Sequence, residues 1–179
     1  MNVTSTNIAI CTFCKQPLRF TFVDLGMSPL CESFLSLEQL NQGESFYPLH
    51  AFVCENCFLV QLEEYVSREN IFTEYAYFSS YADTWLEHCK QYAHMVSERF
   101  NLNQKSFVVE VASNDGYLLQ YFIQLCIPVL GIEPAKNVAK VAEEKGVPTL
   151  TEFFGRELAT QLRNEGKQAD LIAGNNVLA

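Results

Sequence analysis

One stretch in the second half of the chain has the clearest pattern of apolar and polar positions. Residues 107–111 (Phe-Val-Val-Glu-Val) form a short β-branched run, and Ser-Asn-Asp-Gly follows at 113–116. Apolar residues then recur at helical spacing through 118–123. Strand, tight turn and helix in this order are typical of the start of a βαβ unit. Such a unit binds its ligand beyond the carboxyl end of the first strand, where Glu110 and Gly116 lie.

Further apolar runs predict that the unit continues. Residues 127–133 (Ile-Pro-Val-Leu-Gly-Ile-Glu) predict a second strand, 148–150 a third and 169–174 a fourth, with a helix near 155–164 between the last two. Alternating strands and helices favour a parallel sheet of the doubly wound α/β kind.

The acid that ends the second strand indicates a class of ligand. Glu133 stands where a carboxylate suits hydrogen bonds to ribose hydroxyls. The first turn lacks the pattern G-x-G-x-x-G, which disfavours a dinucleotide. S-adenosylmethionine (SAM) is a nucleoside without a pyrophosphate and needs no glycine-rich phosphate cradle. A structural βαβ unit with two incidental acids is the alternative.

Four cysteines in the first third of the chain form two C-x-x-C pairs, Cys11/Cys14 and Cys54/Cys57. Each such turn presents two thiolates to one ion, and two turns complete the tetrahedral shell of a structural Zn²⁺. The alternatives are two unrelated thiol turns or a redox pair, but a redox C-x-x-C is expected beside a βαβ pattern, and neither pair lies there.

The residues between and after these pairs predict a small β-rich domain. Strands are expected at 18–25, 46–53 and 58–62, with a turn at 26–29 and a helical turn at 30–35. Its core is thin, so the metal is expected to supply much of its stability. The remaining cysteines, Cys31, Cys89 and Cys126, are expected to be small buried thiols. Surface or core roles, not catalytic ones, are expected for His50, His88 and His94.

An aromatic connector at 65–81 leads into a predicted helix that carries apolar residues from Trp85 to Phe100 at helical spacing. Ser80 or Asp83 is expected to cap this helix. The connector aromatics have no clean period. They fit either a packed hinge between domains or a lid whose tyrosine hydroxyls face a ligand.

Composition narrows the possible partners. The 179 residues are 49% hydrophobic and 18% charged, which is typical of a globular protein. The net charge of −9 argues against duplex nucleic acid as a binding partner of this chain. No apolar run approaches the roughly 18 residues of a membrane span, and the N-terminus lacks the pattern of a signal peptide. Neither nucleic acid nor a membrane is therefore expected as a partner, and the location is expected to be cytoplasmic.

Ordered motifs span almost the whole chain and resemble one family. They are Cys11-x-x-Cys14, Phe22-Val-Asp-Leu-Gly26, Pro29-Leu30, Tyr47-Pro-Leu49, Cys54-x-x-Cys57, Leu59-Val-Gln-Leu62, the tyrosine and serine run at 75–81, Trp85, residues 109–119, Gly131-Ile-Glu-Pro134, and residues 137–139, 152–155 and 174–179. In these motifs the chain resembles the SAM-dependent sugar C-methyltransferases that carry an N-terminal zinc domain.

The resemblance implies a function and a set of site residues. Family members methylate a carbon of a nucleotide-linked keto-deoxysugar, so a small-molecule nucleotide sugar is the expected substrate. Tyr75 is the first candidate for a catalytic tyrosine near the sugar. The positions expected to bind SAM are Ser80, Glu110, Ser113, Asn114, Asp115, Gly116, Glu133, Pro134, Asn137, Phe153, Phe154, Asn175 and Asn176. Phe153 and Phe154 would flank the adenine, and Asn175 and Asn176 would lie near the methionine end.

Family members continue beyond the motif at 174–179 with a histidine-bearing loop and a further α/β domain. The chain is therefore expected to be an N-terminal portion of a longer enzyme, and inactive or nearly so by itself. Three parts are predicted: a zinc-binding domain at 1–65, the aromatic connector and long helix at 66–104, and a partial Rossmann-like methyltransferase domain at 105–179. Two other functions remain open: a zinc-stabilised interaction module without chemistry, and a methyltransferase with a different carbon acid as substrate.

Overall fold

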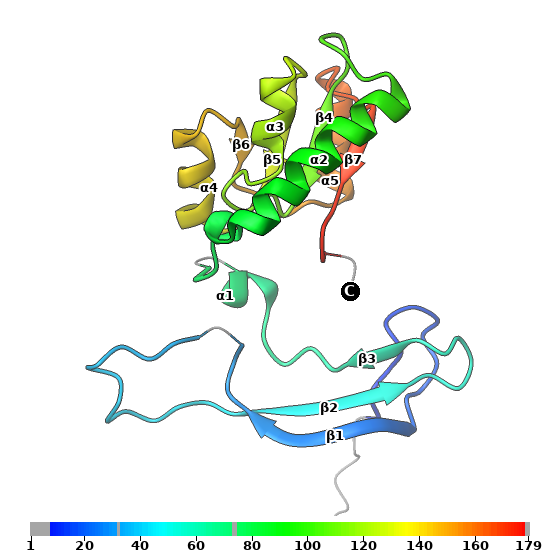
Figure 1. Ribbon diagram of the computed structural model, residues 1–179. Coiled ribbons are helices and arrows are strands. Elements are labelled where there is room, and N and C mark those ends of the chain that lie inside the picture. Colours follow the sequence, from blue (N-terminus) through cyan, green and yellow to red (C-terminus); the bar gives the residue numbers. More distant parts are fainter. Residues whose placement is uncertain (1–7, 32, 73–74, 178–179) are drawn as a thin grey trace, which may run out of the picture. The chain divides into compact units, whose positions relative to one another are not determined.

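The computed structural model describes residues 8–31, 33–72 and 75–177, which fall into two compact units, Met1–Ile71 and Phe72–Ala179. Each unit has its own sheet (Figure 1). The first sheet is antiparallel and the second parallel, which confirms the predicted α/β class with a small β-rich first part. The domain limits at 65 and 105 remain predictions.

The first unit is built on three antiparallel strands in the order β1-β2-β3. They are β1 (Phe20–Ser28), β2 (Tyr47–Val53) and β3 (Val60–Leu62). All three were predicted, although β1 runs further than the alternation at 18–25 indicates. A short helix, α1 (Arg68–Phe72), follows.

The predicted turn at 26–29 is wrong, because β1 continues to Ser28. The register with β2 shifts between Asp24 and Met27, which marks a bulge. Gly26 has a φ of 80° there, and its N–H donates to Asp24 Oδ1 at 2.9 Å. A glycine with positive φ suits a bulge as well as a turn, so the residue type alone does not separate the two.

The helical turn predicted at 30–35 is absent from the described residues of that range, which have no helical assignment. Glu32, which belongs to the prediction, lies outside the described residues. The described residues next to it form a loop between β1 and β2.

Four parallel strands form the second sheet: β4 (Val108–Val111), β5 (Val129–Ile132), β6 (Thr149–Leu150) and β7 (Leu171–Ala173). Their order is β6-β5-β4-β7. Counted from β4, this is 3-2-1-4, the order found in the first part of a doubly wound sheet. The predicted parallel arrangement of these strands is confirmed. The order reverses between β4 and β7, which makes their carboxyl ends the expected ligand position.

Helices cover both faces of this sheet (Figure 1). Residues of α2 (Asp83–Phe100), α3 (Leu119–Gln124) and α4 (Lys136–Glu144) pack with Val108 and Val129 on one face. Residues of α5 (Arg156–Asn164) pack with Val109 and Leu130 on the other. Neighbouring residues of β4 thus point to opposite faces, as a strand requires. Glu110 lies on the same side as Val108.

The predicted long helix α2 begins without the expected cap. Its N-cap is Ala82, which has no side chain able to accept a hydrogen bond, and Asp83 is already the first helical residue. The prediction of Ser80 or Asp83 as the cap is therefore wrong. Ser80 lies instead in a preceding 3₁₀ turn, η1 (Ser79–Tyr81), where its hydroxyl has another partner. Asn101 ends α2 with a φ of 54°.

The cysteines outside the two pairs divide into two kinds. Cys89 is buried in α2 as predicted, but Cys31 and Cys126 are exposed, which corrects the prediction. Cys126 lies in the turn after α3 with a φ of 58°.

The three histidines lie in positions that fit the expected surface or packing roles, and the absence of a catalytic role stays a prediction. His50 Nε2 lies 2.8 Å from Thr21 Oγ1, His88 stacks on Trp85, and His94 is exposed. In the described part of the chain, no helix is both long and apolar enough to cross a membrane.

Candidate functional site

The four paired cysteines converge in the first unit. Cys11 Sγ lies 3.6 Å from Cys57 Sγ, and Cys14 Sγ lies 3.4 Å from Cys54 Sγ. All four sulfur atoms lie within 4.8 Å of one another. A Zn²⁺ ion with bonds of about 2.3 Å to four sulfurs would separate them by about 3.8 Å. The donor set therefore fits a structural zinc ion.

The two cysteine turns have the same backbone form. The N–H groups of Lys15 and Phe58, each four residues after the first cysteine of a pair, donate to the carbonyls of Cys11 and Cys54 at 3.0 and 2.9 Å. Lys15 and Phe58 have φ values of 62° and 61°. Each turn is thus closed by its own backbone.

Gln61 supports this cluster and was missed by the sequence analysis. Its amide nitrogen donates to Cys11 Sγ at 3.2 Å, and its amide oxygen accepts from Thr12 N at 2.8 Å. Hydrogen bonds from the backbone of Cys14 and from Gln61 lower the pKa of Cys11 to about 6, which favours the thiolate that binds metal. The sequence did offer one indication of this role: Gln61 is a polar residue in a short apolar strand directly after the Cys54/Cys57 pair.

In the second unit, Glu110 lies at the carboxyl end of β4 and is fully buried. Its Oε1 accepts a long hydrogen bond of 3.4 Å from the Asn175 side chain, whereas Oε2 has no hydrogen-bond partner among the described residues. Burial raises the pKa of this carboxyl to about 8. Asn175 also donates to the Tyr117 hydroxyl at 3.0 Å. The segments that follow β4 and β7 are thus joined at the point where the strand order reverses.

Glu133 organises the turn after β4 from the end of β5. Its Oε2 accepts from Asn114 N at 2.9 Å, and its Oε1 accepts from Ala135 N at 2.8 Å. Burial raises the pKa of this carboxyl. Each carboxylate oxygen can accept a second hydrogen bond, so these contacts are compatible with binding ribose hydroxyls. They also give Glu133 a structural role that the sequence did not indicate.

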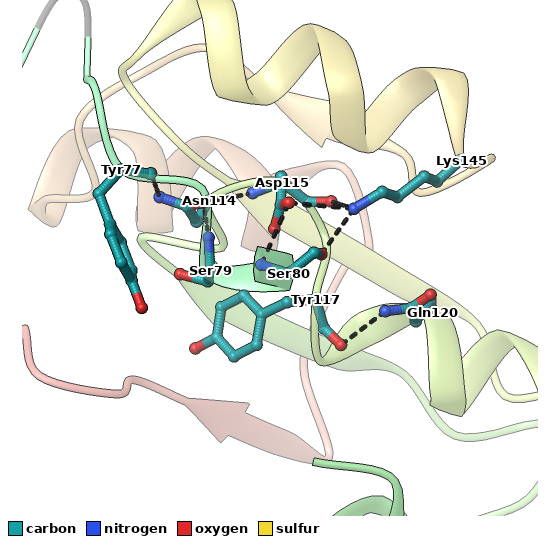
Figure 2. Close-up of polar contacts among 8 residues, drawn as sticks. All are labelled: Tyr77, Ser79, Ser80, Asn114, Asp115, Tyr117, Gln120 and Lys145. Carbon is teal, nitrogen blue, oxygen red and sulfur yellow. Dashed lines mark hydrogen bonds and ion pairs between the residues drawn. The ribbon is translucent and has the colours of Figure 1, made fainter. Parts of the chain in front are cut away.

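Several predicted site residues hold the segment 75–81, which we call the connector strap. Asn114 Oδ1 accepts from Ser79 N at 2.9 Å, and Asn114 Nδ2 donates to Tyr77 O at 3.0 Å (Figure 2). Asn137 forms a similar pair with the backbone of Tyr75, accepting from its N–H at 3.0 Å and donating to its carbonyl at 2.6 Å. The strap therefore runs along the loops that follow β4 and β5.

Asp115 completes this set of contacts. Its Oδ2 accepts from Ser80 N at 3.3 Å and lies 3.0 Å from Lys145 Nζ. Its Oδ1 has no hydrogen-bond partner in the part of the chain that the structure describes, and the side chain is 2% exposed. Ser113 is also fully buried, and its hydroxyl has no partner.

The remaining predicted residues lie at the margin of this group. Phe153 is half-buried and Phe154 is 37% exposed, both between β6 and α5. Pro134 is half-buried after β5, and Asn176 is exposed with a φ of 55°. The structure thus gathers Ser80, Glu110, Ser113, Asn114, Asp115, Glu133, Asn137 and Asn175 around the carboxyl ends of β4, β5 and β7.

Position 116, in the turn after β4, requires glycine. Its φ is 75°, and a Cβ atom there would lie 2.8 Å from Val147 Cγ2 and 3.3 Å from Ala142 Cβ.

Gly116→Ala is therefore expected to destabilise the second unit by about 2 kcal/mol or more, measured by urea unfolding with Trp85 fluorescence. Gly146→Ala is the matched control, because its φ is 82° but no atom lies within 4 Å of the added Cβ. It should cost only about 1 kcal/mol. Equal losses for the two variants would contradict the packing argument.

Comparisons with known proteins give matches to both units. Residues 11–72 match the model of a methyltransferase family described as a zinc binding domain. The chain is 31% identical over 169 residues to the C-methyltransferase NovU of Streptomyces niveus. This chain is similar to a C-methyltransferase over most of its own length. The family resemblance predicted from the motifs is confirmed, and so is the zinc-binding character of the first unit.

The relationship covers the two proteins unequally. The matched region is 94% of this chain but 40% of the C-methyltransferase. Among solved structures, the MccD protein shares 19% identity over 49% of this chain and 32% of its own, with a TM-score of 0.28. The YcgJ protein of Bacillus subtilis shares 10% identity over 50% of this chain and 29% of its own, with a TM-score of 0.27.

Proposed function

We propose that the second unit binds SAM at the carboxyl ends of β4 and β5, as the nucleoside-binding part of a C-methyltransferase. The observation that carries the proposal is a group of buried polar atoms, without hydrogen-bond partners among the described residues, at the end of β4 and in the turn after it. They are Glu110 Oε2, Ser113 Oγ and Asp115 Oδ1. Buried polar atoms are costly unless they find partners, so such a group favours a polar ligand at this place.

Each part of SAM has a residue that fits it. Glu133 would accept hydrogen bonds from the ribose hydroxyls while its backbone partners hold the carboxylate in place. Glu110 and Asn175 would lie near the charged methionine end, where an ammonium would supply the missing partner of Oε2. Phe153 and Phe154 would flank the adenine.

The proposed reaction is methylation of a carbon next to a ketone, on a nucleotide-linked keto-deoxysugar. A base removes the acidic proton beside the carbonyl, and the resulting enolate carbon is the nucleophile. When bound, SAM supplies an electrophilic methyl group and becomes S-adenosylhomocysteine. The chain's own residues would orient the two partners and exclude water. Tyr75, whose backbone is fixed by Asn137, is the proposed tyrosine near the sugar.

The relationship to a C-methyltransferase supports transfer to carbon, and the motifs shared with sugar C-methyltransferases support the sugar substrate. The described cysteines are not paired in disulfides, which fits the proposed cytoplasmic location.

Calorimetric titration of the chain with SAM and with S-adenosylhomocysteine tests the nucleoside site. Saturable binding with a stoichiometry near one is expected, and Glu133→Ala should weaken it about 100-fold or more, because ribose contacts and the turn are lost together. Glu152→Ala is the control, since Glu152 is an exposed acid in the loop after β6. Equal affinity in the parent chain and Glu133→Ala would refute the assignment.

A non-catalytic interaction module stabilised by zinc is the second candidate. The exposed apolar side chains of β1, among them Phe20, Phe22 and Leu25, favour it. Such a module would bind neither nucleoside, so the same titration separates the two.

A further inference from the structure

We infer that Lys145 is a positioning residue that fastens the connector strap to the turn after β4 and so controls how long a nucleoside stays bound. The inference rests on the proposed function for its ligand. We call the contacts of Lys145 with Ser80 and Asp115 the Lys145 clasp.

The clasp joins three segments of the second unit through one ammonium group. Lys145 directly follows α4, and its Nζ donates to Ser80 Oγ at 2.7 Å, to Asp115 O at 3.0 Å and to Asp115 Oδ2 at 3.0 Å. Figure 2 shows Lys145 reaching the Asp115 carboxylate and the Ser80 hydroxyl together. An ammonium has three donors, and all three have an acceptor here.

Charge explains why a cation is needed at this position. The Asp115 side chain is 2% exposed, and Lys145, 31% exposed, is its one ion-pair partner among the described residues. A carboxylate buried to this degree is costly without an opposite charge and hydrogen bonds. Without Lys145, the Asp115 side chain would reorient, and its contact with Ser80 N would be lost.

The clasp also decides which oxygen of Asp115 remains available. Oδ2 is held by Lys145 and by Ser80 N, while Oδ1 has no partner and belongs to the buried polar group proposed to meet the ligand. Lys145 therefore acts through two other residues. It sets the rotamer of Asp115 and holds the strap end at Ser80.

Two kinds of measurement on the full chain test this role, using Lys145→Met and Lys145→Arg. Lys140→Met is the matched control, because Lys140 lies on α4, is 77% exposed and contacts only Glu144 in the ion pairs of the described residues. Amide hydrogen exchange of Ser79 and Ser80 reports strap attachment, with Val109 in β4 as the internal reference. Stopped-flow dissociation of S-adenosylhomocysteine reports residence time.

In Lys145→Met we expect exchange at Ser79 and Ser80 to accelerate about tenfold or more while Val109 is unchanged. The dissociation rate of the nucleoside should rise about tenfold, with the association rate altered by no more than about twofold. Lys145→Arg should recover part of both effects, because it keeps the charge but not the compact geometry. Lys140→Met should match the parent chain.

Uniform acceleration of all amides in the unit would overturn the inference, since Lys145 would then only stabilise the fold. Faster strap exchange with an unchanged dissociation rate would also overturn it. If the parent chain binds neither SAM nor S-adenosylhomocysteine, the proposed function fails and the positioning role fails with it. The exchange of Ser79 and Ser80 would still show whether the clasp itself holds the strap.

Discussion

Loss of the metal, or Cys54→Ala, is expected to unfold the first unit while the second stays folded. The buried hydrophobic residues described in the first unit are Cys11, Leu18 and Cys54, and two of these three are proposed metal ligands. Most of the apolar side chains of β1 are exposed. Hydrophobic burial is therefore too small to hold the sheet, and binding of structural zinc contributes on the order of 10 kcal/mol.

Amide exchange in β2 and zinc content after gel filtration measure this effect. Protection of β2 amides should disappear in Cys54→Ala and after chelation, while Trp85 fluorescence, which reports the second unit, should not change. Cys31→Ser is the matched control, because Cys31 is an exposed thiol of the same unit outside the cluster. Full β2 protection in metal-free Cys54→Ala would show that the fold does not depend on zinc.

Glu110→Gln is expected to stabilise the second unit at pH 8 and above, by on the order of 5 kcal/mol. Burial raises the pKa of Glu110 from 4.5 to about 8. Between these values the folded chain keeps a proton that the unfolded chain releases, so the free energy of unfolding falls as the pH rises from about 4.5 to about 8. Glutamine has nearly the same shape and no charge, so this loss should vanish in the variant.

The free energies of unfolding of the parent chain and Glu110→Gln are compared by urea unfolding of ligand-free protein at several pH values, followed by Trp85 fluorescence. The parent chain and Glu110→Gln should have similar stability below pH 4.5 and diverge as the pH rises. Glu143→Gln controls for the loss of one acidic residue, because Glu143 is exposed on α4. A variant that is less stable than the parent chain at pH 8 would contradict the argument.

Local sequence patterns were sufficient for the strands and for the metal site. Short apolar runs predicted all four parallel strands, because the strands of a parallel sheet have largely apolar sequences. The spacing of Cys11, Cys14, Cys54 and Cys57 predicted the cluster, since a C-x-x-C turn brings its two thiols together by local geometry.

Long-range polar contacts could not be predicted in the same way. Asn114 and Asn137 were expected at the ligand, but their side chains bind the backbone of Ser79 and Tyr75. These partners lie 35 and 62 positions earlier in the chain. Lys145 and Gln61 were missed entirely. Their partners depend on how separate segments meet in the folded unit, and no periodicity records that. Helix α4 was also not predicted from its own pattern.

The cysteine cluster also has a consequence for the unfolded chain. Cys14 and Cys54 lie 40 positions apart, so an ion that bridges them closes a long loop. In the chain-entropy description of a cross-link, a closure of this length removes about 4 kcal/mol of unfolded-state entropy. Doubling the length of the loop would change the closure term by only about 0.6 kcal/mol. The segment between β1 and β2 is therefore a place where insertions are thermodynamically cheap, provided that both cysteine turns remain intact.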